Sequence, residues 1–122
     1  MGGRAWSTRH DMIHKMRLHN EPFISIKNKS KDIELRLNDE KRRLINVNDF
    51  IEFTNTKTNE VIMTKVIKLH VFKSFYELYP CFNKVRLGYN EYEVSNPKDM
   101  EMYYSKEDIN KYGVVGIEIK VI

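Results

Sequence analysis

Cysteine, tryptophan, proline and glycine are all scarce in this 122-residue chain, which holds one Cys, one Trp, three Pro and five Gly. Since Cys81 has no second cysteine to pair with, an internal disulfide is excluded, and one thiol beside six methionines suits a reducing compartment. No apolar run approaches the ~20 residues that a membrane-spanning helix needs, and residues 1–15 lack the apolar middle of a secretion signal. We therefore expect a cytoplasmic protein without a membrane partner.

The usual sequence signatures of catalytic and metal sites are also missing. The chain has no glycine-rich phosphate loop, no Gly-x-Ser-x-Gly nucleophile elbow and no CxxC or HExxH motif. His10, His14 and His19 lie near one another, but their spacings of four and five residues provide no paired ligand geometry with a cysteine or carboxylate. We expect neither a metal ion nor a cofactor.

Positive charge is concentrated at the beginning of the chain. The net charge is +4 and the first 43 residues hold 11 Lys/Arg against 6 Asp/Glu, so the remainder is close to neutral. A basic part beside a near-neutral part suggests one face that attracts polyanions such as nucleic acid.

The length and a hydrophobic fraction of 41% suit one packed domain. Residues 1–11 (MGGRAWSTRHD) show no periodicity, and we interpret them as a disordered tail or a remnant of cloning. The domain is predicted to span residues 12–122.

Alternating apolar and polar residues predict five strands. The strand at 61–71 has apolar residues on both faces, which is typical of a curved or closed sheet. A polar connection at 55–59 joins it to the strand before it as a hairpin. The five predicted strands cover residues 12–18, 31–37, 50–54, 61–71 and 114–122.

Helix starts are indicated at Asn20, Ser74, Asn96 and Ser105, and Gly113 is a helix stop. Strands and helices follow one another irregularly, so we do not expect a doubly wound parallel sheet. We predict an α+β fold: a small, mostly antiparallel β-barrel of five or six strands with two or three short helices.

The most informative stretch is the strictly alternating strand at residues 31–37. Its apolar positions fall on one face, so Glu34 and Arg36 project together from the other, with Lys31 just before them. Two cations around one anion can hold a polar, planar, partly anionic ligand such as a nucleotide. The alternative is a solvent-facing ion pair, which contributes only ~0–1 kcal/mol. The apolar positions are Ile33, Leu35 and Leu37.

Tyrosines are concentrated in the C-terminal half of the chain and are candidates for stacking on bases. The alternative is that their rings pack and their hydroxyls stay hydrated. We expect packing for Tyr112 and leave both interpretations open for Tyr103 and Tyr104.

Residues 29–36 (KSKDIELR) resemble the Gly-x-Lys-x-x-Glu-x-Arg motif of the ASCH domain family in the PUA-like superfamily, with Lys29 in place of the glycine. The segments NDEKRR, DFIEFTN, KSFYELY and YYSKEDINKYGVVGIEIK are similar to bacterial members in the same order. The resemblance covers roughly residues 13–122.

This resemblance implies a PUA-like β-barrel with a cleft beside the motif that holds RNA or a modified nucleoside or nucleotide. Some small members are amidohydrolases that deacetylate N4-acetylcytidine, and others are described as ribonucleases. In the amidohydrolases the motif lysine, here Lys31, is catalytic, but the threonine of that branch is replaced here by Glu34.

Two main hypotheses follow. In a binding module, Arg36 contacts phosphate or a base edge with its forked guanidinium, Lys31 supplies a point charge and Glu34 accepts from an exocyclic amine. In a hydrolase, Lys31 and Glu34 are catalytic. A third alternative is an interaction domain whose cleft has no chemistry, and the pattern leaves the oligomeric state open. The candidate ligand-binding residues are Lys31, Glu34, Arg36, Arg43, Tyr103 and Tyr104.

Overall fold

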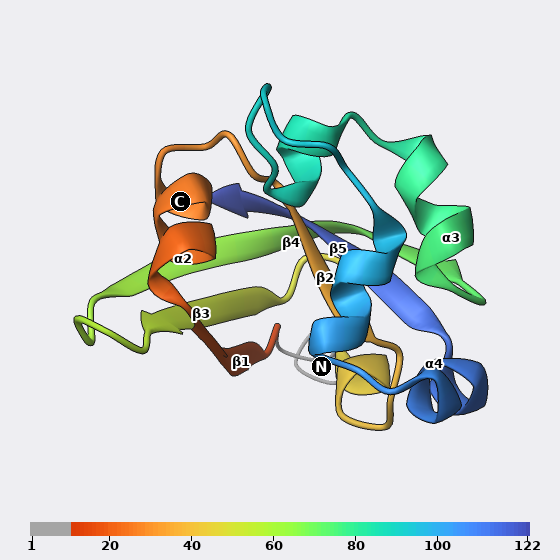
Figure 1. Ribbon diagram of the computed structural model, residues 1–122. Coiled ribbons are helices and arrows are strands. Elements are labelled where there is room, and N and C mark those ends of the chain that lie inside the picture. Colours follow the sequence, from red (N-terminus) through yellow and green to blue (C-terminus); the bar gives the residue numbers. More distant parts are fainter. Residues whose placement is uncertain (1–10) are drawn as a thin grey trace, which may run out of the picture.

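A computed structural model describes residues 11–122 (Figure 1), so nearly all of the predicted tail lies outside the described residues. The chain forms five strands, three α-helices and four 3₁₀-helices over this range. Each strand lies within two residues of its predicted bounds. The strands are β1 (Ile13–Leu18), β2 (Ile33–Leu37), β3 (Phe50–Asn55), β4 (Val61–Phe72) and β5 (Val114–Val121).

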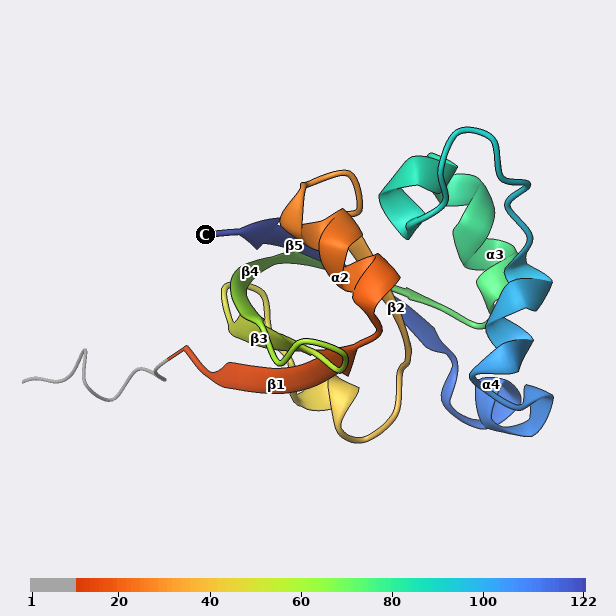
Figure 2. The same ribbon diagram turned by 60° about the vertical axis from the view of Figure 1, so that its left-hand side comes forward.

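The five strands form one sheet in the order β1-β3-β4-β5-β2. The sheet curls into a half-barrel, with β1 and β2 as its two edges (Figure 2). Three of its four pairings are antiparallel, as predicted, but β1 pairs with β3 in parallel. A parallel pair needs a long crossover, and here α2 and β2 lie between the two strands in sequence.

Strand β4 explains how the sheet curls. Its first residues pair with β3 and its later ones with β5, and a bulge interrupts the register between Val66 and Lys68. The extra residue shifts the alternation of side chains by one position. Ile62 and Val66 before the bulge and Leu69 after it therefore all face the same core.

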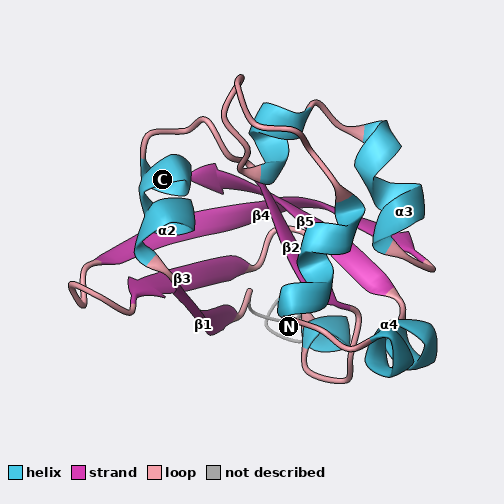
Figure 3. Cartoon of the chain, in the orientation of Figure 1, coloured by secondary structure: helices cyan, strands magenta, loops and turns pink. Residues whose placement is uncertain are grey.

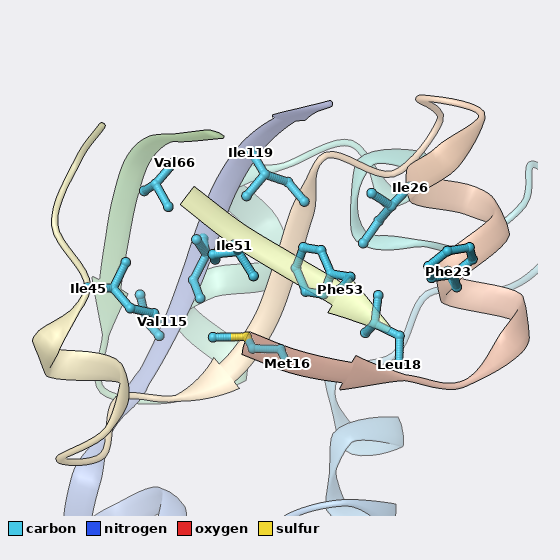
Figure 4. Close-up of a cluster of buried hydrophobic side chains, with 11 residues drawn as sticks. Met16, Leu18, Phe23, Ile26, Ile45, Ile51, Phe53, Val66, Val115 and Ile119 are labelled. Carbon is cyan, nitrogen blue, oxygen red and sulfur yellow. The ribbon is translucent and has the colours of Figure 1, made fainter. Parts of the chain in front are cut away.

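The first core fills the concave side of the half-barrel (Figure 4). Helix α2 (Asn20–Lys27) covers it and contributes Phe23 and Ile26, which are completely buried. The core comprises Met16, Leu18, Phe23, Ile26, Ile45, Ile51, Phe53, Val66, Val115, Ile117 and Ile119.

The predicted cap of α2 was wrong by one residue. The N-cap is His19, whose side chain makes no capping hydrogen bond, and Asn20 is the first helical residue. The side chain of Asn20 is used differently: its Oδ1 accepts a hydrogen bond of 2.9 Å from Nδ2 of the buried Asn55. This bond ties the start of α2 to the end of β3.

The second core lies between the opposite face of β2 and β5 and a layer of short helices, seen in Figure 3. This layer holds α3 (Phe75–Leu78), α4 (Lys106–Tyr112), and the 3₁₀-helices η2 (Tyr79–Cys81), η3 (Lys84–Leu87) and η4 (Pro97–Met102). The remaining 3₁₀-helix, η1 (Arg42–Leu44), precedes β3. The second core comprises Ile33, Leu35, Phe75, Leu78, Tyr79, Leu87, Met100 and Val114.

The predicted helix signals act as expected in this layer. Ser74 and Ser105 accept hydrogen bonds from the backbone amides of Glu77 and Asp108, and α4 ends before Gly113. The start at Asn96 leads into the 3₁₀-helix η4. Across residues 11–122, every helix is too short or too polar to cross a bilayer.

Candidate functional site

The alternation predicted for β2 places its charged residues together. Ile33 and Leu35 enter the second core, so Glu34 and Arg36 project from the opposite face. Glu34 is 4% exposed and Lys31 is 7% exposed. An exposed ion pair, which was the alternative interpretation, is therefore not what the chain forms.

Lys31, Glu34 and Arg36 form a connected group, which we call the triad. Lys31 Nζ lies 3.2 Å from Glu34 Oε1, and Arg36 Nε donates to Glu34 Oε2 at 2.7 Å. Each carboxylate oxygen thus contacts one cation. Two positive groups and one negative group leave the triad with a net charge of +1.

The surroundings of Glu34 determine its protonation state. Burial by itself would raise the pKa of this carboxyl, but the charges of Lys31 and Arg36 and their hydrogen bonds outweigh it, so the pKa lies below its ordinary value. Burial likewise disfavours the charged form of Arg36, but Glu34 outweighs that effect and the pKa of Arg36 is raised. Glu34 is therefore a carboxylate at neutral pH.

Arg36 also connects the two edges of the half-barrel. Its Nη2 donates to the backbone carbonyl of Arg17 on β1 at 3.0 Å. Strands β1 and β2 are not paired with each other in the described sheet. The Arg36 side chain therefore bridges the seam between them.

The helical layer holds the other end of the triad. Lys31 Nζ donates to the backbone carbonyl of Leu87, at the end of η3, at 3.1 Å. Gly88 follows with φ of +110°, and a Cβ atom there would lie 3.1 Å from Cδ of Lys31. Glycine thus permits both the left-handed turn and the close passage of the lysine side chain.

We expect Gly88→Ala to lower the free energy of unfolding by about 1–3 kcal/mol, because it adds backbone strain and a methyl group against Lys31. Urea denaturation measures the loss. In a Lys31→Ala background the Cδ atom is gone, so the same Gly88→Ala change should cost less. An equal cost in both backgrounds would show that the lysine contact plays no part.

Tyr104 lies beside the triad, whereas Tyr103 is 60% exposed. Burial raises the pKa of the Tyr104 hydroxyl, and the positive charge of Arg36 acts against that rise. The Tyr104 ring stacks on Phe75 with centroids 6.1 Å apart. Tyr104 therefore contributes a fixed aromatic ring next to the charged group.

Arg43 has backbone partners of its own. Its Nε donates to the carbonyl of Asn38 at 2.7 Å, and its Nη2 donates to the carbonyl of Tyr112 at 3.3 Å. Since Tyr112 is the last residue of α4, Arg43 supports the end of that helix. None of its described hydrogen bonds joins the triad.

Sequence reasoning missed a second polar cluster in the helical layer. The hydroxyls of Tyr79 and Tyr89 are 3.0 Å apart, and Tyr89 donates to Asp99 at 2.8 Å. Burial and the Tyr89 contact raise the pKa of Tyr79. Gly88 and Tyr89 lie in a segment without periodicity, so only the turn-forming glycine signalled structure there.

The chemistry available at the triad is that of charge and hydrogen bonding. Its groups are one ammonium, one guanidinium and one carboxylate, which suit a polar ligand with anionic oxygens. Residues 11–122 contain no group of three or more His, Cys, Asp or Glu placed to hold a metal ion.

Comparison with known proteins places this geometry in a family. The ASCH domain profile matches residues 16–122. The crystal structure of the hypothetical protein PH0355 is 33% identical with a TM-score of 0.77, and the match covers 91% of this chain and 100% of that one. The solution structure of protein PF0455 from Pyrococcus furiosus is 32% identical with a TM-score of 0.69, covering 91% and 98%. The curated proteins provide no match. From the profile and the shared PUA-like fold, the chain belongs to the ASCH domain family.

Proposed function

We propose that this ASCH domain binds RNA, or a modified nucleoside or nucleotide, at the triad. The observation that carries the proposal is the net charge of +1 on three groups connected through Glu34, of which Lys31 and Glu34 are buried and the Arg36 side chain is 14% exposed. Buried charge is expensive unless it is compensated, so an unbalanced cation there favours an anionic ligand. The basic first third of the chain supports the same ligand class.

The triad keeps hydrogen-bonding groups for a ligand. Arg36 has five N–H donors, and its described bonds use Nε toward Glu34 and one Nη2 donor toward Arg17. The remaining fork can contact a phosphate or a base edge. Each oxygen of Glu34 has a second lone pair that can accept from an exocyclic amine.

The neighbouring tyrosines suit the bases of the same ligand. Tyr104 is held against Phe75 beside the triad, and Tyr103 presents an exposed ring. Stacking of one base on an aromatic side chain contributes about 1–3 kcal/mol and tolerates any base. Selectivity would then come from the hydrogen bonds of the triad.

A second candidate is a hydrolase acting on an acylated nucleoside such as N4-acetylcytidine, or a ribonuclease. The 3.2 Å contact between Lys31 and Glu34 favours it, because proton transfer needs groups within hydrogen-bond reach. Against it, Lys31 is paired as an ammonium with the Glu34 carboxylate, and an ammonium has no lone pair with which to act as a general base. Release of cytidine from N4-acetylcytidine, abolished by Lys31→Ala, would favour the hydrolase.

The binding proposal is tested by measuring the affinity for short single-stranded RNA at low salt with fluorescence anisotropy. We expect Lys31→Gln combined with Arg36→Gln to weaken binding at least tenfold, because two contacts worth about 1–3 kcal/mol each are lost. The milder Arg36→Lys keeps the charge but loses the fork, and should weaken binding less.

The matched control removes two positive charges elsewhere. Lys41 and Lys57 are exposed, and their side chains have no described partner. Their double change to glutamine should alter affinity less than twofold. RNA affinity that survives loss of Lys31 and Arg36 in a folded protein would refute the proposal.

A further inference from the structure

A hollow of about 190 Å³ lies between α2, the loop before β2 and the end of β5. Its polar lining consists of Lys29, Lys31, Asp32 and Lys120, and we call it the lysine hollow. One water takes up about 30 Å³ of liquid, so the hollow has room for a tetrahedral oxyanion. Because Lys31 belongs to both, the lysine hollow adjoins the triad.

The positive charge of the lysine hollow is only partly compensated within residues 11–122, where Lys31 is paired with Glu34. Lys29 and Lys120 have no acidic partner there. Asp32, the one carboxylate of the lining, is held by Arg86 through contacts of 2.8 and 3.2 Å. Lysines without a counter-ion around a hollow favour an anionic occupant.

The backbone at Lys29 has an uncommon conformation for a residue with a side chain. Its φ is +72°, in the left-handed region that favours glycine, and the motif that this segment resembles has glycine at that position. Lys29 follows the C-cap of α2, where a left-handed residue commonly ends a helix, and it places a cation on the rim of the hollow.

A fourth lysine, Lys65, extends the positive surface beyond the hollow. Lys65 on β4 is directly opposite Lys120 on β5. Directly opposed residues share one face of a sheet, and like charges in that position destabilise it. Neither lysine has an ion pair within the described residues, so an anion between or near them would relieve the repulsion.

We propose that the lysine hollow binds an internucleotide phosphate of an oligonucleotide whose neighbouring base occupies the triad. This inference rests on the proposed function and makes it more specific. A ligand that occupies both places must be longer than a nucleoside. A nucleotide and a polynucleotide strand both meet this requirement, and an internucleotide phosphate specifies the strand.

The test compares a tetranucleotide RNA, a nucleoside 5′-monophosphate and the corresponding nucleoside. We expect Lys29→Gln combined with Lys120→Gln to weaken tetranucleotide binding five- to tenfold at low salt and to leave nucleoside binding unchanged. Loss of one phosphate contact should reduce the slope of log K against log salt by about 0.7. The Lys41→Gln and Lys57→Gln control should leave the slope unchanged.

A second variant separates charge from folding. Lys29→Gly relieves the positive φ and removes the cation, so it should raise the urea midpoint while weakening tetranucleotide binding. A residue with a merely structural role would not move the two measurements in opposite directions.

The outcomes distinguish the two proposals. Tetranucleotide binding that is lost with the triad but unchanged by Lys29→Gln and Lys120→Gln would overturn this inference and leave the proposed function standing. An equal loss in the control variant, or a monophosphate that binds as tightly as the tetranucleotide, would overturn it too. A wild-type protein that binds none of the three would overturn both.

Discussion

Glu34→Ala is expected to lower the free energy of unfolding by about 3–5 kcal/mol, measured by urea denaturation at pH 7. The substitution removes the only carboxylate of the triad and leaves Lys31 and Arg36 facing each other. Both cations are poorly accessible, with side-chain exposures of 7% and 14%. Little of either side chain reaches water, so most of the cost of the two unpaired cations falls on the folded state.

Glu60→Ala is the matched control for this prediction. Glu60 also forms an ion pair, with Lys27, but both side chains are about half exposed. An exposed pair contributes about 0–1 kcal/mol, so its loss should be hard to measure. If Glu34→Ala cost no more than Glu60→Ala, the triad would have to be hydrated, and the argument from its burial would fail.

The energetics of the triad also help to decide whether it serves stability or function. Replacing a buried ion group by apolar residues of similar volume is often neutral or stabilising. Three buried charges are therefore weak evidence for a role in stability, whereas charged groups with perturbed pKa values are common at functional sites. The bridge from Arg36 to Arg17 shows one structural use, but Lys31 makes no such bridge between strands.

Local sequence patterns sufficed to predict most of the helices and strands. Within the site, they predicted that Glu34 and Arg36 lie on one face of β2. Alternation along β2 predicted that Glu34 and Arg36 share a face, because side chains of a strand alternate whatever the strand packs against. Ser74 and Ser105 predicted helix starts for a similar reason: their hydrogen bonds reach only three residues along the chain.

Contacts between distant segments could not be predicted in this way. The parallel pairing of β1 with β3 depends on the crossover through α2 and β2, which no short pattern records. Lys31 is held by Leu87 from a segment without periodicity, 56 residues away in sequence. Arg43 was a candidate ligand contact, and only the fold reveals that it holds the end of α4.

Acidification is expected to destabilise the protein in a pH window that Glu34 defines. Its pKa in the folded protein is below the ordinary glutamate value of about 4.3. Between the two values the unfolded chain binds more protons than the folded one, so protonation favours unfolding. The stabilisation from Glu34 is complete above about pH 4.3 and disappears as the pH falls through the lower, folded-state pKa.

One such group changes the free energy of unfolding by at most about 1.36 kcal/mol per pH unit. Urea denaturation of the wild type and of Glu34→Gln at several pH values between 7 and 3 isolates it, because every other carboxylate contributes equally to both proteins. The variant should be less stable at pH 7, and its disadvantage should shrink as the pH falls. A constant difference across the window would mean that the two cations do not hold the Glu34 pKa down, and the triad would then lack the strong electrostatic coupling inferred from its contacts.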